Sequence, residues 1–469
     1  MKKLIISLIT ISMTFASEPI KTAVLGLGGR AQNLLLECLS LKDETDKELK
    51  VVAVCDDHAF ACLTAFTQML GYHPQAKAYK KMFSKASYYP DTPDGLKQLF
   101  KEHPDVDRIL ITSANNRHLA HLSSALTNSP CQNIFIEKPL FCNLDEFKSF
   151  ASCPSTKRVA VGLTLRYSNM TRIVCEKLKQ YQAPLGQLKK VKAWEHVSFG
   201  HAFTMIMMNW RRYQSVSGGL LIEKSVHDLD LSLTFMQALG CSPKTLSITT
   251  KAFHELFKKS NQAAILNHLQ KNAYFAQNVA GWDTIPWQRT ISFVYNQAGL
   301  VNWPATCEAF FKEFPANDDF SKSDIIPDHQ KLTAKMITQK GHLIDFELDV
   351  CLTGSLSAKR GVQMEFEKGE VIVDVIYGKM WVKQHGKYPL EIDLQTNGRA
   401  HAGGDTFVAH TILDTLPQGQ HQALIQDPAV QLSSLMGLVS EYQALHHLNS
   451  PIHLTQRGNQ WKIDFPTKN

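Results

Sequence analysis

The sequence predicts an α/β fold in which a doubly wound parallel sheet is followed by a second region of antiparallel strands and helices. Two patterns lead to this prediction. Between residues 20 and 167, short apolar runs alternate with amphipathic segments, as in parallel strands joined by covering helices. Beyond residue 168, runs such as 343–352, 361–368 and 370–377 alternate apolar and polar residues, which is typical of antiparallel strands with one buried face.

The composition is that of a globular protein. The chain has 469 residues, of which 44% are hydrophobic and 20% charged, enough for two or three domains. The net charge of +7 is spread along the chain without basic runs interleaved with aromatics, so we predict no nucleic-acid partner. The ten cysteines are scattered and no Cys/His group has zinc spacing, so we predict buried free thiols and no metal.

The first residues have the layout of an export signal. Residues 1–16 combine a basic start with an apolar stretch that ends in small residues, and the stretch is too short to span a bilayer. We therefore predict a cleaved signal peptide and an exported, periplasmic protein. The scattered cysteines suit a reducing compartment, so the cytoplasm is the alternative.

A glycine turn follows the first predicted strand, residues 20–25, and opens a predicted helix. The turn reads GLGGRA and fits the G-x-G-x-x-A form of the dinucleotide fingerprint. Its first glycine permits a tight turn, its second lets the backbone approach a pyrophosphate, and its alanine lets the helix pack close to the strand. We predict an NAD-binding Rossmann domain whose turn supplies the cofactor contacts Gly26, Gly28, Gly29, Arg30 and Ala31.

An acidic residue ends the second predicted strand. Asp56 follows the apolar run of residues 49–55, where a carboxylate can accept hydrogen bonds from the ribose hydroxyls of a dinucleotide. The same carboxylate repels the extra phosphate of NADP, so we predict NAD as the cofactor. The spacing from Gly26 to Asp56 exceeds the usual gap of about 20 residues, and the charged loop at residues 42–48 accounts for the difference.

Polar residues follow several later strands of the predicted parallel sheet. Ligands of doubly wound sheets bind at the carboxyl ends of the strands, where the sequences SAN, EKP and RYS fall. We therefore expect cofactor or substrate contacts from the residues of these segments, namely Asn116, His118, Glu137, Lys138, Arg166 and Tyr167.

The chain resembles the Gfo/Idh/MocA family of NAD(P)-dependent oxidoreductases. The matching pieces occur in order along the chain and read GLGGRA, VCD, TSANNRH, IEKPL, VGLTLRYS, NWRRY, SGGLLIEKSVHDLDL and HAGGD. The resemblance implies a Rossmann domain over residues 20–167 and an α/β domain over residues 168–469. It also implies that the second domain has an open, mostly antiparallel sheet through which the protein forms a homo-oligomer. Substrates of this family are sugars, cyclitols and related polyols.

The resemblance also implies a catalytic set. Lys138 of the EKP motif corresponds to a lysine near the nicotinamide, where a positive charge stabilises a developing alkoxide. Glu223 and His227 correspond to an Asp and a His, and their spacing puts both on one helix face. We expect His227 to take the substrate proton and Glu223 to orient its ring. Glutamate in place of aspartate leaves open whether Glu223 reaches His227, the substrate or both.

Further residues are candidates for the substrate pocket. Asp230 lies three residues after His227 on nearly the same face, and the other candidates occupy family positions near substrate or end the sixth strand. We predict substrate contacts from Asp230, Arg166, Tyr167, Trp210, Arg211 and His401. Residues 251–289 form a predicted insertion that either covers the pocket or makes an oligomer contact.

These features predict an NAD-dependent oxidoreductase that transfers hydride between a polyol and nicotinamide. Two alternatives remain. Some relatives keep NAD bound and cleave a glycosidic bond through a transient oxidation with no net redox change. The other alternative is an NAD-binding regulator without turnover, which has no need of Lys138, Glu223 and His227 together.

Overall fold

The computed structural model describes residues 18–71, 73–151, 156–198, 201–202, 205–206, 210–271, 308, 311–313, 323–352, 358–396, 400–458 and 460–466. The predicted signal peptide, residues 1–16, and residues 272–289 of the predicted insertion lie outside this set. Of the insertion, the structure describes the end of a strand, a single 3₁₀ turn at Lys259–Asn261 and the helix α13 (Gln262–Lys271).

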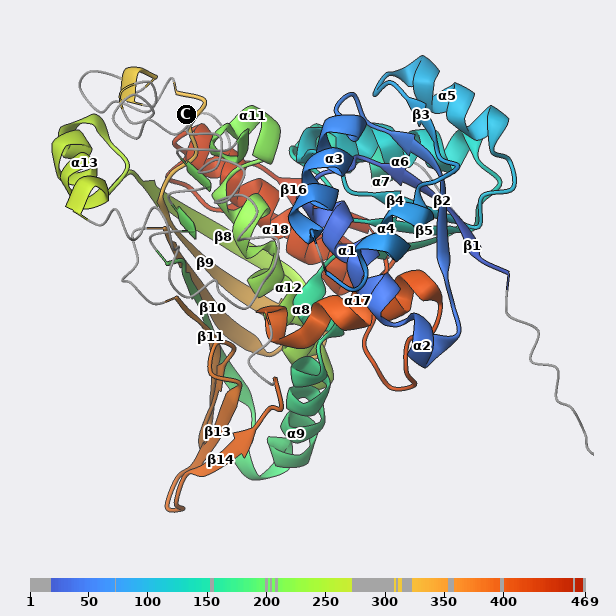
Figure 1. The fold of residues 1–469 in the computed structure, drawn as a ribbon. Coiled ribbons are helices and arrows are strands. Elements are labelled where there is room, and N and C mark those ends of the chain that lie inside the picture. The colour runs from blue at the N-terminus through green and yellow to red at the C-terminus, as the bar shows by residue number, and fades with distance from the viewer. Residues whose placement is uncertain are drawn as a thin grey trace, which may run out of the picture.

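The first region is a six-stranded parallel sheet (Figure 1). Its strand order is β3-β2-β1-β4-β5-β6, so the order reverses between β1 and β4, as in a doubly wound sheet that binds dinucleotides. The strands are β1 (Ile20–Leu25), β2 (Leu49–Cys55), β3 (Ser87–Tyr89), β4 (Arg108–Ile111), β5 (Asn133–Ile136) and β6 (Arg158–Val161). The predicted parallel sheet is therefore confirmed.

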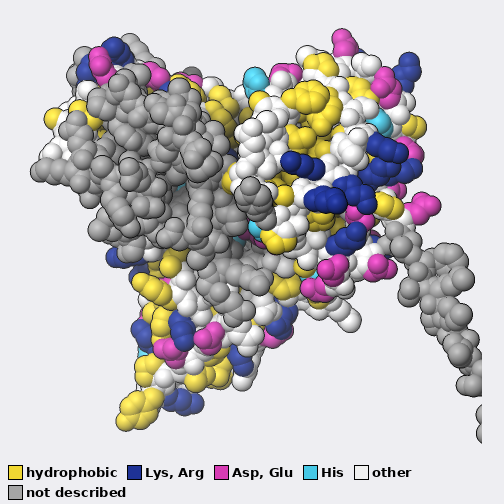
Figure 2. Space-filling view, in the orientation of Figure 1, with side chains coloured by type: hydrophobic (Ala, Val, Ile, Leu, Met, Phe, Trp, Pro, Cys, Tyr) yellow, Lys and Arg dark blue, Asp and Glu magenta, His cyan; other side chains and the backbone are white. Residues whose placement is uncertain are grey.

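Helices connect these strands, as the alternating pattern predicts. They are α1 (Gly29–Ser40), α2 (Lys42–Thr45), α3 (Ala59–Leu70), α4 (Ala76–Met82), α5 (Pro93–Glu102), α6 (His118–Asn128) and α7 (Leu144–Ala151). On the face in Figure 2, Lys and Arg side chains gather over the helices beside the parallel sheet, with acidic side chains among and below them. The charge of this face is therefore mixed.

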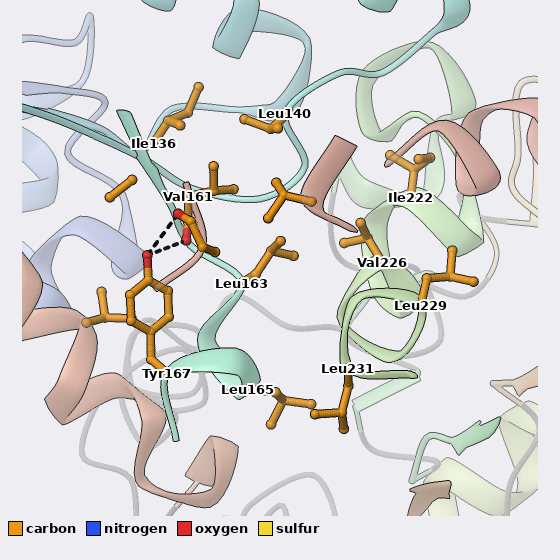
Figure 3. Packing of buried hydrophobic residues seen from close by; sticks show 14 of the residues in the cluster. Ile136, Leu140, Val161, Leu163, Leu165, Tyr167, Ile222, Val226, Leu229 and Leu231 are labelled. Carbon is orange, nitrogen blue, oxygen red and sulfur yellow. Dashed lines mark hydrogen bonds between the residues drawn. The ribbon is translucent and has the colours of Figure 1, made fainter. Parts of the chain in front are cut away.

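One strand is shorter than predicted. The sequence predicts that Arg166 and Tyr167 end the sixth strand, but β6 ends at Val161 and a short helix, α8 (Thr164–Tyr167), follows. The Tyr167 hydroxyl explains part of this turn, because it donates to the carbonyl oxygens of Val161 at 3.0 Å and Ala423 at 3.2 Å (Figure 3). Arg166 and Tyr167 thus lie on a helix behind the strand end.

The second region is a ten-stranded sheet in the order β14-β13-β12-β11-β7-β10-β9-β8-β15-β16. It is mostly antiparallel, with β7 and β10 the parallel pair among the described strands. The strands are β7 (Leu188–His196), β8 (Pro243–Phe253), β9 (His329–Thr338), β10 (Leu343–Cys351), β11 (Lys359–Phe366), β12 (Gly369–Asp374), β13 (Lys379–Gln384), β14 (Leu390–Asp393), β15 (Ile452–Arg457) and β16 (Gln460–Asp464). The predicted mostly antiparallel sheet is confirmed.

Helices fill the space between the two sheets in Figure 1. α12 (Val226–Ala238) packs on β7, and α18 (Pro428–Leu445) packs on β8 and on α12. Every residue of α12 from Val226 to Met236 is buried, so the helix lies inside the core on all sides. α9 (Asn169–Leu185) packs beside α12.

The last third of the chain returns to the parallel sheet. α17 (Gly404–Leu413) packs on α1, and Val161 at the end of β6 donates its N–H to Ala423 at 2.8 Å. One buried cluster therefore runs through both regions, and Figure 3 shows Ile136 and Val161 of the parallel sheet in the same core as Val226 and Leu229 of α12. This packing brings the carboxyl edge of the parallel sheet against the start of α12.

The cysteine prediction holds for most of the described cysteines. Cys38, Cys55, Cys131, Cys142, Cys175 and Cys241 are buried free thiols, whereas Cys62 and Cys351 are free thiols that are only half-buried. Among the described helices, none has the length and hydropathy needed to cross a membrane.

Candidate active site

The glycine turn has the geometry of an anion cradle. Gly26 adopts a φ of +91°, and a Cβ there would lie 2.4 Å from the Cα of Ser113, so only glycine fits. A Cβ on Gly28 or Gly29 would meet nothing within 4 Å, so the outer side of the turn is open to a ligand. α1 begins here without a side-chain cap, and its first N–H groups therefore face this opening. The cradle fits a dinucleotide pyrophosphate.

Asp56 stands beside this turn. It follows β2, and its Oδ2 accepts the N–H of Leu27 at 2.7 Å while its Oδ1 accepts the N–H of His58 at 2.7 Å. A carboxylate oxygen has more than one lone pair, so these bonds orient Asp56 and leave acceptor capacity for ribose hydroxyls. The ribose contact itself stays a prediction.

Arg30 joins the cofactor turn to two other parts of the chain. Its Nε donates to Glu137 Oε1 at 2.6 Å, its Nη1 to Asp405 Oδ1 at 2.6 Å, and its Nη2 to Thr164 at 3.0 Å. A Cβ on Gly162 would lie 2.6 Å from the Glu137 carboxyl carbon, so the glycine makes room for this bridge. The half-buried Arg30 and the buried Glu137 therefore form an ionic link beside the predicted cofactor path.

Lys138 extends from the end of β5 toward the second region. The Lys138–Pro139 peptide bond is cis. The Lys138 Nζ donates to the main-chain oxygen of Glu223 and to its Oε1 at 3.2 Å. Burial lowers the pKa of Lys138, and the charge of Glu223 opposes this shift. The EKP motif and the second region thus meet at one ammonium group.

Glu223 lies on a π-helical turn, Leu221–Ser225, that leads into α12. Its Oε2 accepts the Asn115 amide at 2.6 Å, and its Oε1 accepts the Arg211 Nε at 2.7 Å. Burial favours a raised pKa for Glu223, but Lys138, Arg211 and Asn115 outweigh burial and lower the pKa to about 2. Glu223 is therefore a fixed anion that holds three donors together.

The expected bond between Glu223 and His227 is absent from the described structure. The π turn changes the phase of the side chains relative to an α-helix, and the carboxylate is taken by Asn115, Lys138 and Arg211 instead. Within the described part of the chain, Nδ1 of His227 has no hydrogen-bond partner. Burial, with nearby cations, lowers the pKa of His227 well below its usual value.

His401 lies opposite His227. The two ring centroids are 6.1 Å apart. Nδ1 of His401 is 2.9 Å from Asp405 Oδ2, and the His401 side chain is 36% exposed. Trp210 and Arg211 border the same Glu223 cluster, with the guanidinium carbon of Arg211 4.5 Å from the Trp210 ring centroid. The structure therefore brings Lys138, Glu223, His227, Arg211 and His401 into one neighbourhood.

Comparison with known proteins identifies the first region. Residues 20–164 match the family model described as an oxidoreductase family with an NAD-binding Rossmann fold, GFO_IDH_MocA. This region belongs to the Gfo/Idh/MocA family. Over 210 residues, which are 44% of this chain and 44% of its relative, the sequence is 22% identical to YteT of Bacillus subtilis (strain 168), named as an oxidoreductase. The match thus spans less than half of that relative.

Solved structures share the fold over nearly the whole chain. An inositol dehydrogenase homolog from Azotobacter vinelandii, complexed with NAD⁺, is 13% identical with a TM-score of 0.57, and the match covers 93% of this chain and 97% of that one. A levoglucosan dehydrogenase complexed with NADH and levoglucosan is 9% identical with a TM-score of 0.57, covering 94% and 100%. These likenesses show that the two regions of this chain together have the fold of those solved proteins.

Two predicted substrate contacts instead form an internal ion pair. Arg166 is 2% exposed and Asp230 is 1% exposed. Arg166 Nε donates to Asp230 Oδ2 at 2.9 Å, its Nη2 donates to Oδ1, and its Nη1 donates to Asp427 at 2.5 Å. Because these groups satisfy one another in the core, Arg166 and Asp230 are not available to a substrate. Tyr167 is likewise fully buried and bonded to main-chain oxygens.

The predicted contacts after β4 also need correction. Asn116 is exposed, whereas its neighbour Asn115 is buried and binds Glu223 and the Ser217 carbonyl oxygen at 2.9 Å. His118 is buried with its ring nitrogens 2.6 Å from the Pro139 oxygen and 3.1 Å from the Ser113 oxygen. It therefore braces the loop behind Lys138 instead of facing a cofactor. Adjacent asparagines gave no sequence signal to separate them.

Two further carboxylates support the helix start without facing the site. Asp228, which an amphipathic helix would expose, is 1% exposed and binds Arg360 through both oxygens at 2.8 and 2.9 Å. Glu441 of α18 is also buried, and its Oε1 accepts the Leu221 N–H at 2.6 Å. A Cβ on Gly219 would lie 2.2 Å from the Glu441 carboxyl carbon, which explains this glycine. Burial raises the pKa of Glu441 to about 8.

Proposed function

We propose that the chain is an NAD-dependent oxidoreductase that transfers hydride between a carbinol carbon of a sugar, cyclitol or related polyol and nicotinamide. The observation that supports this most is the meeting of Lys138, from the carboxyl edge of the parallel sheet, with Glu223, from the start of α12. The half-buried ammonium group of Lys138 lies beside the face where a Rossmann fold binds its dinucleotide. Membership of the first region in an NAD-binding oxidoreductase family supports the same activity.

The cofactor site is built from the glycine turn and Asp56. The N–H groups of Gly28, Gly29 and Arg30 at the start of α1 would hold the pyrophosphate, and Asp56 would accept the ribose hydroxyls. A carboxylate at this place disfavours the additional phosphate of NADP, so NAD is the proposed cofactor. When bound, NAD supplies the hydride acceptor or donor of the reaction.

Lys138 is the group that would bind the reacting oxygen. Its ammonium can donate to a carbinol oxygen and stabilise negative charge as that oxygen loses its proton. Glu223 keeps the ammonium in place through two contacts, and Asn115 and Arg211 keep Glu223 in place in turn. Glu223 thus has a different role from the one the family pattern implies, since it positions Lys138 and not the His227 ring.

The rest of the site suits a hydroxylated ring. Trp210 offers an apolar face, while Arg211 and His401 offer hydrogen-bonding groups at its edge. Solved proteins of the same fold carry names that include inositol and levoglucosan, which are compounds of this kind. Either His227 or His401 lies where a proton from the substrate hydroxyl can be received.

The activity is tested by incubating the purified full chain with NAD and, separately, with myo-inositol, D-glucose and levoglucosan, and following NADH by its absorbance. We expect NADH to form with at least one compound, faster with NAD than with NADP, and to be lost in Lys138→Met. Absence of NADH with every polyol would refute the proposal. If an aryl glycoside were cleaved without NADH formation, the redox-neutral glycosidase would take its place.

A further inference from the structure

The pair His401 and Asp405 has the arrangement of a proton-accepting dyad. We propose that His401 Nε2, with His401 oriented by Asp405, receives the proton of the substrate hydroxyl, in place of His227. This inference rests on the proposed oxidoreductase function. It assigns a catalytic role to a segment, Ala400–Gly403, that precedes α17 and lies far along the chain from Lys138.

The hydrogen bond between His401 and Asp405 determines which ring nitrogen of His401 carries a proton. Nδ1 lies 2.9 Å from Asp405 Oδ2, and an anionic carboxylate can only accept, so Nδ1 carries the proton. The lone pair is then on Nε2, which is the nitrogen that can take a proton from a hydroxyl. When Nε2 is protonated, the Asp405 carboxylate stabilises the resulting positive charge.

Asp405 is held as an anion by the cofactor turn. Its Oδ1 accepts Arg30 Nη1 at 2.6 Å, and Arg30 is anchored in turn on Glu137 at 2.6 Å. Burial favours a raised pKa for Asp405, but Arg30 and His401 outweigh burial and hold the pKa well below its usual range. The proton-accepting pair is therefore connected through charged contacts to the start of α1, where the dinucleotide pyrophosphate would bind.

The backbone at His401 and Ala402 is left-handed, with φ of +50° and +52°. Non-glycine residues adopt this region uncommonly, and histidine does so more readily than alanine. Such conformations persist where the surroundings enforce them. The bond to Asp405 and the close approach of Gly404 to the Thr164 main chain, 2.1 Å for an added Cβ, hold this turn.

His227 lacks the corresponding support. Within the described residues its Nδ1 has no partner, it is 7% exposed, and the carboxylate expected to orient it is occupied by Lys138, Arg211 and Asn115. Burial, followed by the nearby cations Arg360 and Lys138, lowers the pKa of His227 and disfavours its protonated form. Because its ring centroid is 6.1 Å from that of His401, His227 still borders the same space and suits a neutral hydrogen-bonding role.

The proposed step is balanced with NAD⁺ as the co-reactant. The O–H bond of the substrate carbinol breaks and its proton forms a bond with His401 Nε2. Bound NAD⁺ would supply the acceptor for the hydride of the carbinol C–H bond, so that the C–O bond would become a carbonyl. Lys138 donates to the oxygen throughout, and His401 afterwards releases its proton to water. The products are a ketone, NADH and one proton.

The kinetic test compares three substitutions of the same kind, His401→Gln, His227→Gln and His453→Gln, with myo-inositol and NAD as the probe. His453 is exposed on β15 and serves as the matched control. We expect His401→Gln to lower kcat by about 10²–10⁴, with NAD affinity unchanged in a direct binding measurement. His227→Gln should lower kcat by a smaller factor, and His453→Gln should have the kcat of the wild-type protein. Added imidazole should partly restore His401→Ala. Equal turnover of His401→Gln and the wild-type protein would overturn the assignment.

A second readout does not depend on turnover. In protein labelled with ¹⁵N-histidine, the ring-nitrogen shifts report the tautomer, and the His401→Gln spectrum identifies the His401 signal. We expect the Nδ1–H tautomer in the wild-type protein and a loss of that preference in Asp405→Asn. An Nε2–H tautomer, or a signal unaffected by Asp405→Asn, would contradict the dyad. If myo-inositol, D-glucose and levoglucosan all fail to reduce NAD in the wild-type protein, the oxidoreductase function fails instead, and the tautomer still tests the pair.

Discussion

The start of α12 presents two sets of charged side chains with opposite environments. On one side, Glu223 gathers Lys138, Asn115 and Arg211 at the edge of the parallel sheet, and the Lys138 and Arg211 side chains keep 18% and 36% exposure. On the other side, Asp230 pairs with Arg166 at 1% and 2% exposure, fully enclosed in the core. The difference teaches that a carboxylate with partly exposed cationic partners leaves those partners accessible to a ligand, whereas one with buried partners holds two elements together.

The largest expected effect concerns the buried pair of Arg166 and Asp230. Arg166→Met leaves Asp230 and Asp427 without their guanidinium partner, and removing one member of a buried pair costs about 3–5 kcal/mol. We expect the free energy of unfolding to fall by this amount in urea titrations, while the protein that remains folded keeps its turnover. Loss of turnover at unchanged stability would return Arg166 to the substrate pocket and break the comparison.

Lys138→Met tests the partly exposed set of side chains around Glu223. The substitution keeps the length of the chain and removes the ammonium donor, so we expect kcat to fall by about 10²–10³ with little loss of stability. Part of the burial cost of the ammonium disappears, which offsets the lost contact with Glu223. Steady-state kinetics and urea unfolding of the same preparation measure both quantities. A large drop in stability with unchanged kcat would assign Lys138 to the structural side.

Glu441→Gln tests the effect of a buried carboxyl group on the pH dependence of stability. Burial raises the pKa of Glu441 to about 8, so the folded protein keeps a proton that the unfolded chain releases near its ordinary pKa of 4.5. The stabilising effect of that proton is present below the unfolded pKa and is lost as pH rises toward 8. We expect wild-type stability to fall relative to the variant by up to roughly 1.4 kcal/mol per pH unit in this window. Urea unfolding of both proteins at several pH values measures it, and parallel curves would contradict the buried, neutral Glu441.

The smallest expected effect distinguishes Asn115 from its neighbour Asn116. Asn115→Ala removes a donor from the buried Glu223 carboxylate, at a cost of about 1–3 kcal/mol, and loosens the anchor of Lys138. We expect kcat to fall by about tenfold for each 1.4 kcal/mol that the reacting state loses. Asn116→Ala is the matched control, because this side chain is exposed, and it should leave kinetics and stability unchanged. A larger kinetic effect from Asn116 would restore the original prediction.

Much of the fold follows from local patterns. The parallel strands, the glycine turn and the later antiparallel strands depend on short-range periodicity, which the sequence displays directly. The site depends on contacts between distant segments, such as Lys138 with Glu223 and Arg30 with Asp405. Family resemblance indicated most of the residues that meet, but not their pairings. That Glu223 contacts Lys138 and not His227 became clear only from the π turn and the contacts of its carboxylate.

Sequence predictions were wrong where the pattern of charged residues was compatible with two different arrangements of the side chains. The carboxylates of residues 223, 228 and 230 all lie on one short segment, and periodicity assumes that a charged residue faces solvent or a site. α12 is buried on every side, so Asp228 and Asp230 are enclosed with arginines from other elements instead. An apolar helix with several acids, together with arginines elsewhere in the chain, therefore signals internal ion pairs as readily as a catalytic set.

Deuterium transfer tests the central claim most directly. The full chain is incubated with NAD⁺ and myo-inositol deuterated at its carbinol carbons, and the nicotinamide product is analysed by mass spectrometry, with Lys138→Met in parallel. An oxidoreductase that uses this site will yield NADH heavier by one deuterium in the wild-type protein and almost none in the variant. Wild-type NADH that forms without deuterium, or with equal yield in Lys138→Met, would contradict direct hydride transfer at Lys138.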